Sequence, residues 1–183
     1  VDFTDRLCEA TLRTMIGNVP KVLSTPDDYA ARAEIMWACK LAHDNTAGLG
    51  RQQDWASHSI AHEIGGAHDL AHGAIMGVIF AAWLKFVKTR NPRKLVQLGD
   101  RVFGTNSEAT GPEVAATDAI AGYVNFLRSI AMPTNLAELG VEGDADFEGL
   151  AQRSVRFMKS GTIGNYVRLS APDVVELLKG AQC

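Results

Sequence analysis

The helical spacing of apolar residues, which continues along nearly the whole chain, limits the fold of this sequence more than any other feature. Apolar positions that recur every three or four residues place a hydrophobic stripe on one face of a helix, whereas a half-buried strand alternates apolar and polar residues. We find no convincing alternating strand and no internal repeat. The sequence therefore predicts an all-α, multi-helix fold.

Local signals place the first two helices. One helix is predicted over residues 7–15 and is closed by Gly17, with Pro20 beyond it. Residues 24–28 then supply a capping hydroxyl, a proline and two acids, which together favour the start of a second helix that ends near His43.

The later helices follow from caps, breakers and apolar spacing. Asp54 is predicted to cap a third helix, and Gly65 with Gly66 is predicted to end or kink it, because adjacent glycines weaken a helix. Turns are predicted over residues 104–112 and 140–144. Further helices are predicted from His72 and over residues 92–103, 113–130, 147–158 and 172–178.

Composition excludes several classes of protein. The chain has 183 residues, 46% of them hydrophobic, which suffices for one globular domain with a sizeable core. A net charge of -3 without a Lys/Arg-rich run excludes an electrostatic nucleic-acid binder. Cys8, Cys39 and Cys183 are an odd number at unrelated spacings, which predicts neither a disulfide framework nor a cysteine zinc site and fits a reducing cytoplasm.

The most apolar stretch covers residues 74–87 and is interrupted by Lys85. It is shorter than the roughly 20 residues that a membrane-spanning helix needs. The sequence therefore predicts a buried core helix and no membrane association. The chain also begins at Val1 without an initiator methionine or a signal-peptide pattern, so we expect a fragment of a longer protein.

The histidines gather in one part of the chain. Residues 43–72 contain all five of them, and the rest of the chain contains none. His58 and His62 are four residues apart, as are His68 and His72, so each pair shares a helix face and has the spacing of a metal-binding pair. The fifth histidine is His43.

His58 and His72 share a metal only if the chain reverses between them. In an uninterrupted helix the 14 residues that separate them would span ~21 Å at ~1.5 Å per residue. Gly65 and Gly66 lie where such a reversal is needed.

Other interpretations of these residues stay open at this stage. A histidine on an apolar helix face is more often a hydrogen-bonded core or surface residue than a ligand. His62 and Glu63 begin a zinc-protease HExxH motif, but Gly66 occupies the position of its second histidine. Asp54 and His58 form a D-x3-H pair that suits a metal, although Asp54 is equally explained as a helix cap.

Apolar and acidic neighbours of the histidines have structural explanations. Helical amphipathicity alone favours core positions for the large apolar residues of this region. Glu63 and Asp69 are expected as solvated surface acids, with orientation of ligand imidazoles as the alternative. The residues predicted to be core, with a substrate pocket as the alternative, are Trp55, Met76, Phe80, Trp83 and Phe86.

Residues 53–63 (QDWASHSIAHE) and 68–74 (HDLAHGA) closely resemble the signature of iron-containing alcohol dehydrogenases, most of all the branch of butanol dehydrogenases and broad aldehyde reductases. That signature has one histidine, a second four residues on, and a His-Gly ten residues further, as at His58, His62 and His72. Residues 26–37 and 165–179 resemble other helices of the family.

The resemblance implies a domain organisation and a set of site residues. Residues 1–183 would form the single, all-helical, metal-binding C-terminal domain of the dehydroquinate synthase-like fold, without the N-terminal nucleotide-binding domain. His58 and His72 would be metal ligands, and His62 would be a catalytic proton-transfer residue that also contacts the nicotinamide cofactor. The family's other two ligands, an Asp and a His, would precede Val1.

The resemblance also implies the activity. It predicts an NAD- or NADP-dependent oxidoreductase that interconverts small alcohols and aldehydes with a divalent metal, Fe²⁺ being expected and Zn²⁺ the alternative. We expect a cytoplasmic homo-oligomer, and an isolated chain that is inactive without the nucleotide-binding domain. The competing hypotheses are a non-catalytic helical module that binds metal or a partner, and a zinc hydrolase that needs no NAD(P)H.

Overall fold

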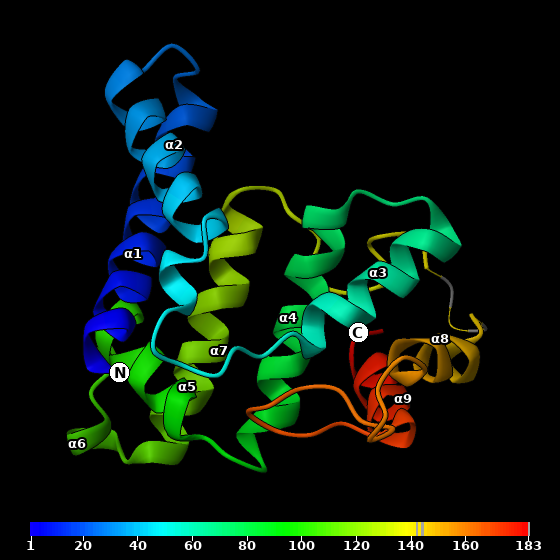
Figure 1. Ribbon diagram of the computed structural model, residues 1–183. Coiled ribbons are helices and arrows are strands. Elements are labelled where there is room, and N and C mark those ends of the chain that lie inside the picture. Colours follow the sequence, from blue (N-terminus) through cyan, green and yellow to red (C-terminus); the bar gives the residue numbers. More distant parts are fainter. Residues whose placement is uncertain (142, 144, 183) are drawn as a thin grey trace.

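The computed structural model describes residues 1–141, 143 and 145–182. In this part of the chain the regular elements are helices, and one isolated antiparallel bridge joins Ile163 to Leu169, which confirms the all-α prediction (Figure 1). The helices are α1 (Asp2–Ser24), α2 (Tyr29–His43), η1 (Thr46–Gly48), α3 (Ala56–His68), α4 (His72–Lys88), α5 (Arg93–Leu98), η2 (Gly99–Phe103), α6 (Ser107–Thr110), α7 (Pro112–Ser129), α8 (Phe147–Val155) and α9 (Ala171–Gly180).

The helices form an arm and a body. Helices α1 and α2 pack against each other as an antiparallel hairpin, the arm, which stands at one side of the molecule (Figure 1). In the body, α4 packs against α3, α7 and α9, and α3 also packs against α8. The central place of α4 follows from its sequence, because it is apolar on nearly all sides.

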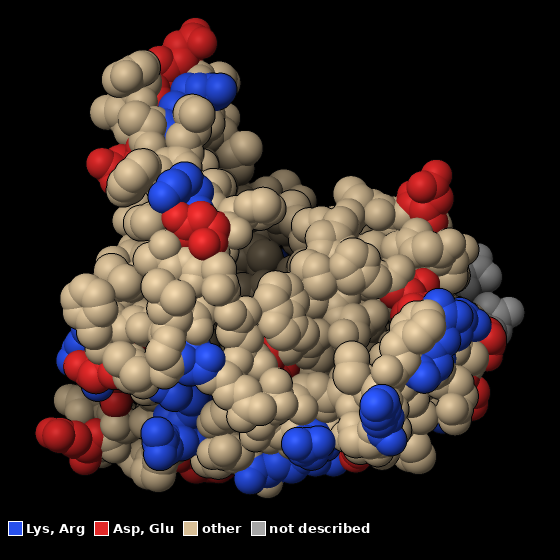
Figure 2. Space-filling view, viewed as in Figure 1, with Lys and Arg blue, Asp and Glu red and all other residues tan. Residues whose placement is uncertain are grey.

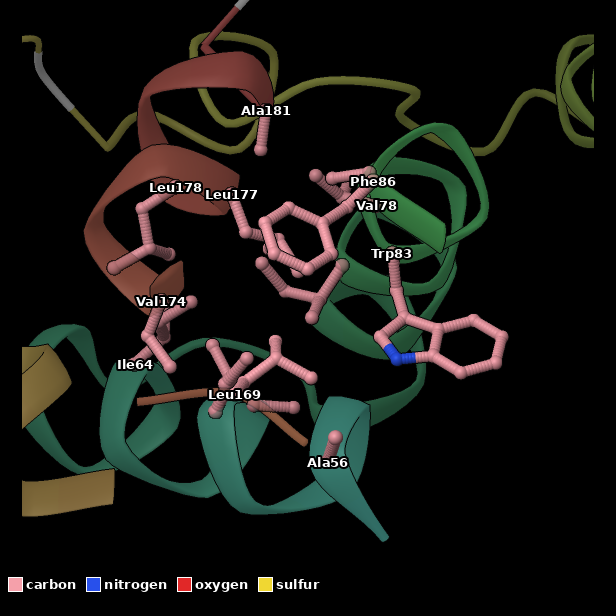
Figure 3. Packing of buried hydrophobic residues seen from close by; sticks show 14 of the residues in the cluster. Ala56, Ile64, Val78, Trp83, Phe86, Leu169, Val174, Leu177, Leu178 and Ala181 are labelled. Carbon is pink, nitrogen blue, oxygen red and sulfur yellow. The ribbon is translucent and has the colours of Figure 1, made fainter. Parts of the chain in front are cut away.

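The core lies between α3, α4 and α9 (Figure 3). Ile64 from α3, Val78 and Phe86 from α4, and Leu177 and Leu178 from α9 all point into it. Each large apolar side chain that is fully buried contributes roughly 1.5–3 kcal/mol to stability. The predicted buried helix over residues 74–87 is therefore confirmed, and among the described residues no helix combines the length and hydropathy needed to cross a membrane.

The arm corrects two predicted helix ends. Helix α1 does not close at Gly17 but continues through Pro20 to Ser24, because packing along α2 outweighs the weak helix propensity of these residues. Helix α2 is capped by Asp28 and not by the predicted hydroxyl: the Asp28 carboxylate accepts a hydrogen bond from Ala31 N (3.0 Å). Its predicted end near His43 is confirmed.

The remaining helices lie where they were predicted, with small shifts at the ends. The predicted helix over residues 92–103 is split into α5 and η2, and the predicted turn over residues 104–112 contains the short α6. Residues 142 and 144 of the predicted turn, and Cys183, lie outside the described residues. Cys8 and Cys39 are free thiols.

A partly buried ionic network fastens the arm to the body. The Asp5 carboxylate of α1 accepts hydrogen bonds from Arg51 Nη2 (2.6 Å), Lys94 Nζ (2.5 Å) and Gln97 Nε2 (3.0 Å). Burial alone would raise the pKa of Asp5, but the hydrogen bonds from Lys94 and Gln97 and the charges of Lys94 and Arg51 outweigh it and hold that pKa well below its usual range.

We predict that Asp5→Asn lowers the free energy of unfolding at pH 7 by about 1.5–3 kcal/mol, because it removes a charged acceptor that three donors share in a partly buried network. The depressed pKa adds stability above the unfolded-state value of about 3.9, and this contribution is lost as the pH falls towards the folded-state pKa. Urea unfolding at pH 7 and below pH 4 should therefore show a gap between wild type and variant that narrows in acid.

The matched control is Asp2→Asn, because Asp2 pairs with arginines at the surface and its side chain is 70% exposed. Its cost should stay below about 1 kcal/mol. A gap for Asp5→Asn that is as small as this control, or that does not change with pH, would contradict the assignment.

Candidate metal centre

Helix α3 carries two of the candidate site residues, His58 and His62. The N-cap residue of α3 is Trp55 and not Asp54 as predicted, but Asp54 still holds the first turn, because its Oδ1 accepts a hydrogen bond from Ala56 N (2.9 Å). Ile60 and Ile64 are fully buried and fix which face of α3 meets the core. His58 and His62, four residues apart, share a face at the edge of the body, where His58 is partly buried and His62 is exposed.

The chain reverses between α3 and α4, although not where the sequence predicted. Gly65 and Gly66 lie inside α3, and the helix ends only at His68. The reversal occurs over residues 69–71, where Asp69 adopts the left-handed conformation (φ 50°, ψ 48°) and its N–H donates to Gly65 O. A short polar side chain tolerates this conformation, so Asp69 performs the helix-ending role that was predicted for the glycines.

Gly65 has a packing role instead. A Cβ atom at Gly65 would lie 3.3 Å from Cδ1 of Ile75, a fully buried residue of α4, whereas a Cβ atom at Gly66 would meet nothing within 4 Å. The absence of a side chain at Gly65 lets α3 and α4 approach closely just beyond the turn.

The reversal brings three histidines together. The ring centroids of His58 and His72 are 4.8 Å apart, those of His58 and His62 are 4.5 Å apart, and those of His62 and His72 are 4.9 Å apart. Their potential ligand atoms all lie within 4.8 Å of one another. His58 and His72 thus lie close to each other, as two ligands of a shared metal must, and His62 lies equally near to both of them. His43 and His68 are outside this cluster.

Imidazole nitrogens that lie this close together suit a divalent transition metal. Burial, followed by the charges of His62 and His72, lowers the pKa of His58, which keeps its ring neutral and its lone pair free near pH 7. Nitrogen ligands of a tetrahedral zinc ion lie about 3.3 Å apart, so binding needs the rings to close gaps of up to ~1.5 Å. Rotation of the exposed rings of His62 and His72 allows this adjustment.

Trp55 stands beside the cluster, contrary to the prediction that it is core. Its side chain is 56% exposed, and its ring meets the His58 ring edge-on with centroids 5.2 Å apart. Trp83 and Phe86 are buried, as predicted, and Phe80 packs partly buried against the core. The prediction for Trp55 is wrong because this residue lies just before α3, where the helical spacing of apolar residues does not indicate which side chains are buried.

The nearby acids do not join the cluster. Asp54 directs its carboxylate to backbone N–H groups, which favours its structural role over the alternative of a metal ligand. Glu63 forms ion pairs with Arg153 (3.3 Å) and Arg156 (3.9 Å). Asp69 is exposed at the end of α3. Among the described residues, the candidate site is thus made of imidazoles alone.

A hollow lies between the arm and the start of α3. The surface is recessed there (Figure 2), and a cavity of about 450 Å³ is bounded by residues of α2, η1 and the segment that leads into α3. Trp55 lines this cavity and also contacts His58, so the hollow adjoins the histidine cluster.

An all-helical domain that folds three histidines together across a helix–turn–helix has the donor set of a transition-metal protein. The chain belongs to the iron-containing alcohol dehydrogenase family: the sequence model described as "Fe-containing alcohol dehydrogenase family, C-terminal" matches residues 1–182.

Individual relatives agree with this assignment. The chain is 32% identical to NADH-dependent butanol dehydrogenase A of Clostridium acetobutylicum over 96% of its own length and 44% of that protein. It is 33% identical to the NADPH-dependent aldehyde reductase YqhD of Escherichia coli over 77% of its own length and 36% of that protein. The chain thus spans less than half the length of these relatives.

The fold agrees as well. The crystal structure of NADH-dependent butanol dehydrogenase A from Thermotoga maritima superimposes with a TM-score of 0.90 and 28% identity, covering 99% of this chain and 46% of that chain. The family and the helical C-terminal fold implied by the sequence resemblance are therefore confirmed.

The contact between Gly65 and Ile75 leads to a prediction about how α3 and α4 approach. Gly66→Ala should raise the free energy of unfolding by about 0.5–1 kcal/mol, because alanine is the better helix former and its methyl group meets open space. Gly65→Ala should gain less or lose stability, because its methyl group must displace Ile75. Urea unfolding of the two variants measures the difference, and equal stabilisation by both would disprove the close approach.

Proposed function

We propose that this chain forms the metal-binding half of an NAD(P)-dependent, iron-containing alcohol dehydrogenase that interconverts primary alcohols and aldehydes. One observation carries the proposal: His58, His62 and His72 converge within 4.8 Å in a chain of this family. The names of the relatives, which are butanol dehydrogenases and an aldehyde reductase, support the reaction class. The nucleotide-binding domain and the remaining metal ligands are assigned to a part of a longer protein outside this chain.

His58 and His72 are the proposed metal ligands. They come from two helices that pack into the same core, so their backbone positions are set before a metal binds and only the side chains need to adjust. Fe²⁺ is the proposed metal because the family is described as Fe-containing, and Zn²⁺ is the alternative because imidazole suits both ions. When bound, the metal supplies a Lewis acid that polarises the oxygen of the alcohol or carbonyl group.

His62 is proposed to transfer the substrate proton and to contact the nicotinamide. In alcohol oxidation, carbon loses a hydride to NAD(P)⁺, and the hydroxyl group loses its proton. An imidazole can accept that proton and release it to water. The position of His62 supports this role, because it is next to both proposed ligands and is exposed to solvent.

The substrate, the cofactor and the assembly of the enzyme are proposed from the same relatives and the same family. The substrate is a small alcohol or aldehyde, and the cofactor is NAD or NADP, since the relatives' names include both NADH- and NADPH-dependent enzymes. We propose a cytoplasmic homo-oligomer in which this helical domain meets the nucleotide-binding domain.

In the full-length protein, His58→Ala and His72→Ala should each lose metal and activity together, because an incomplete ligand set loses both affinity and Lewis acidity. His62→Ala should keep its metal while kcat falls about 10²- to 10⁴-fold, as is typical when a proton-transfer group is removed. Metal analysis by mass spectrometry, combined with initial rates of alcohol oxidation, measures both effects.

His43→Ala is the matched control, because His43 is exposed and lies outside the cluster. It should change neither metal content nor rate. Full metal retention by His58→Ala or His72→Ala would overturn the ligand assignment, and metal loss by His62→Ala would make that residue a third ligand instead.

The purified 183-residue chain is predicted neither to bind NAD(P)H tightly nor to oxidise primary alcohols with added Fe²⁺ or Zn²⁺, because the assigned nucleotide-binding domain and half of the ligands are lacking. Fluorescence titration with NADH and NADPH, followed by rate assays with butanol, tests this. Measurable turnover by the chain alone would refute the proposal that activity needs a separate nucleotide-binding domain.

A further inference from the structure

The carboxylate of Asp54 joins two segments that are far apart in the sequence. Its Oδ1 accepts a hydrogen bond from Ala56 N (2.9 Å) in the first turn of α3. Its Oδ2 accepts two more, from Asn165 N (2.7 Å) and Tyr166 N (2.8 Å), in the loop that precedes α9. Successive backbone N–H groups that point at one spot form a concave site for an anion, and Asp54 supplies that anion from within the chain.

The loop over residues 163–169 has a backbone conformation that suits this contact with Asp54. Reciprocal hydrogen bonds between Ile163 and Leu169 close it (2.9 and 2.8 Å). Gly164 has a φ of +84°, and a Cβ atom there would lie 2.6 Å from Val167 O and 3.2 Å from Asp54 Oδ2. Only glycine fits at this position, so the backbone can approach the carboxylate closely.

The loop is also attached to the body on its far side. The Tyr166 hydroxyl donates to Asn91 O (2.8 Å), between α4 and α5, and accepts from Lys94 N (3.0 Å) in the first turn of α5. The Asn165 side chain donates to Gln53 O (2.7 Å), beside Asp54. Movement of the start of α3 relative to α4 must therefore break bonds made by this loop.

His58 follows Asp54 by four residues and lies in the first turn of α3, which begins at Ala56. The first turn of α3 sets the position of the His58 backbone, and His72 begins α4 on the other side of the cluster. Helix α3 is joined to α4 by the turn at one end, and through Asp54 and the loop at the other.

We propose that Asp54 is a positioning residue for the metal site: its carboxylate, held by the amides of Asn165 and Tyr166, fixes the first turn of α3 and thereby places His58 opposite His72. The inference rests on the proposed function, since it takes His58 to be a ligand. It also explains why an acid stands one turn before His58 without joining the cluster.

The test is a Co²⁺ titration of the full-length protein, followed by visible absorption of the bound ion. Asp54→Asn should weaken Co²⁺ binding about tenfold or more and alter the absorption spectrum, because the amide cannot accept all three hydrogen bonds. Asp54→Glu keeps the negative charge but moves the carboxylate, and it should weaken binding similarly. It also provides an independent reading if the asparagine variant does not fold.

Asp28→Asn is the matched control, because Asp28 caps α2 through one hydrogen bond to Ala31 N, in the arm and outside the cluster. It should leave Co²⁺ affinity unchanged. Wild-type affinity in Asp54→Asn, or rescue of the affinity by Asp54→Glu, would overturn the positioning role while leaving the proposed function intact. If the wild type does not bind Co²⁺, or binds it no more tightly than His58→Ala does, both the proposed function and this inference are wrong.

Discussion

The reversal of the chain over residues 69–71 is the constraint on which the site depends. Without it, His58 and His72 would stand ~21 Å apart along one helix, whereas the turn brings their rings to 4.8 Å. The reversal is stable because each helix buries an apolar face in the same core, which leaves the histidine-bearing edge free for chemistry. One face of α3 thus packs into the core and stabilises the fold, and another face carries the histidines of the candidate site.

Polar contacts refine what the core establishes. Hydrophobic burial is non-directional and tolerates small displacements, but ligands to a shared metal must meet within tenths of an ångström. Directional bonds supply this accuracy: Asp69 ends α3 through its backbone, and Asp54 ties the opposite end to the loop before α9. The network around Asp5 similarly fixes the arm beside the hollow.

Sequence patterns predicted much of this architecture, because helical spacing, the apolar stretch of α4 and the clustered histidines are local features. They did not locate the reversal, because paired glycines favour a break in a helix. In the structure Gly65 lies within α3, where the lack of a side chain allows the close approach of Ile75. Asp69 adopts the left-handed backbone conformation that ends the helix. The exposure of Trp55 and the bonds from Asp54 to Asn165 and Tyr166 depend on segments distant in sequence, which local patterns cannot report.

The central claim is that α3 and α4 together hold one metal ion. Anomalous diffraction at the absorption edge of the bound metal, from crystals of the full-length protein, tests it most directly. We expect a single strong peak within ~2.3 Å of a ring nitrogen of both His58 and His72. A peak that contacts only one of these histidines, or a metal bound elsewhere with the cluster empty, would contradict it.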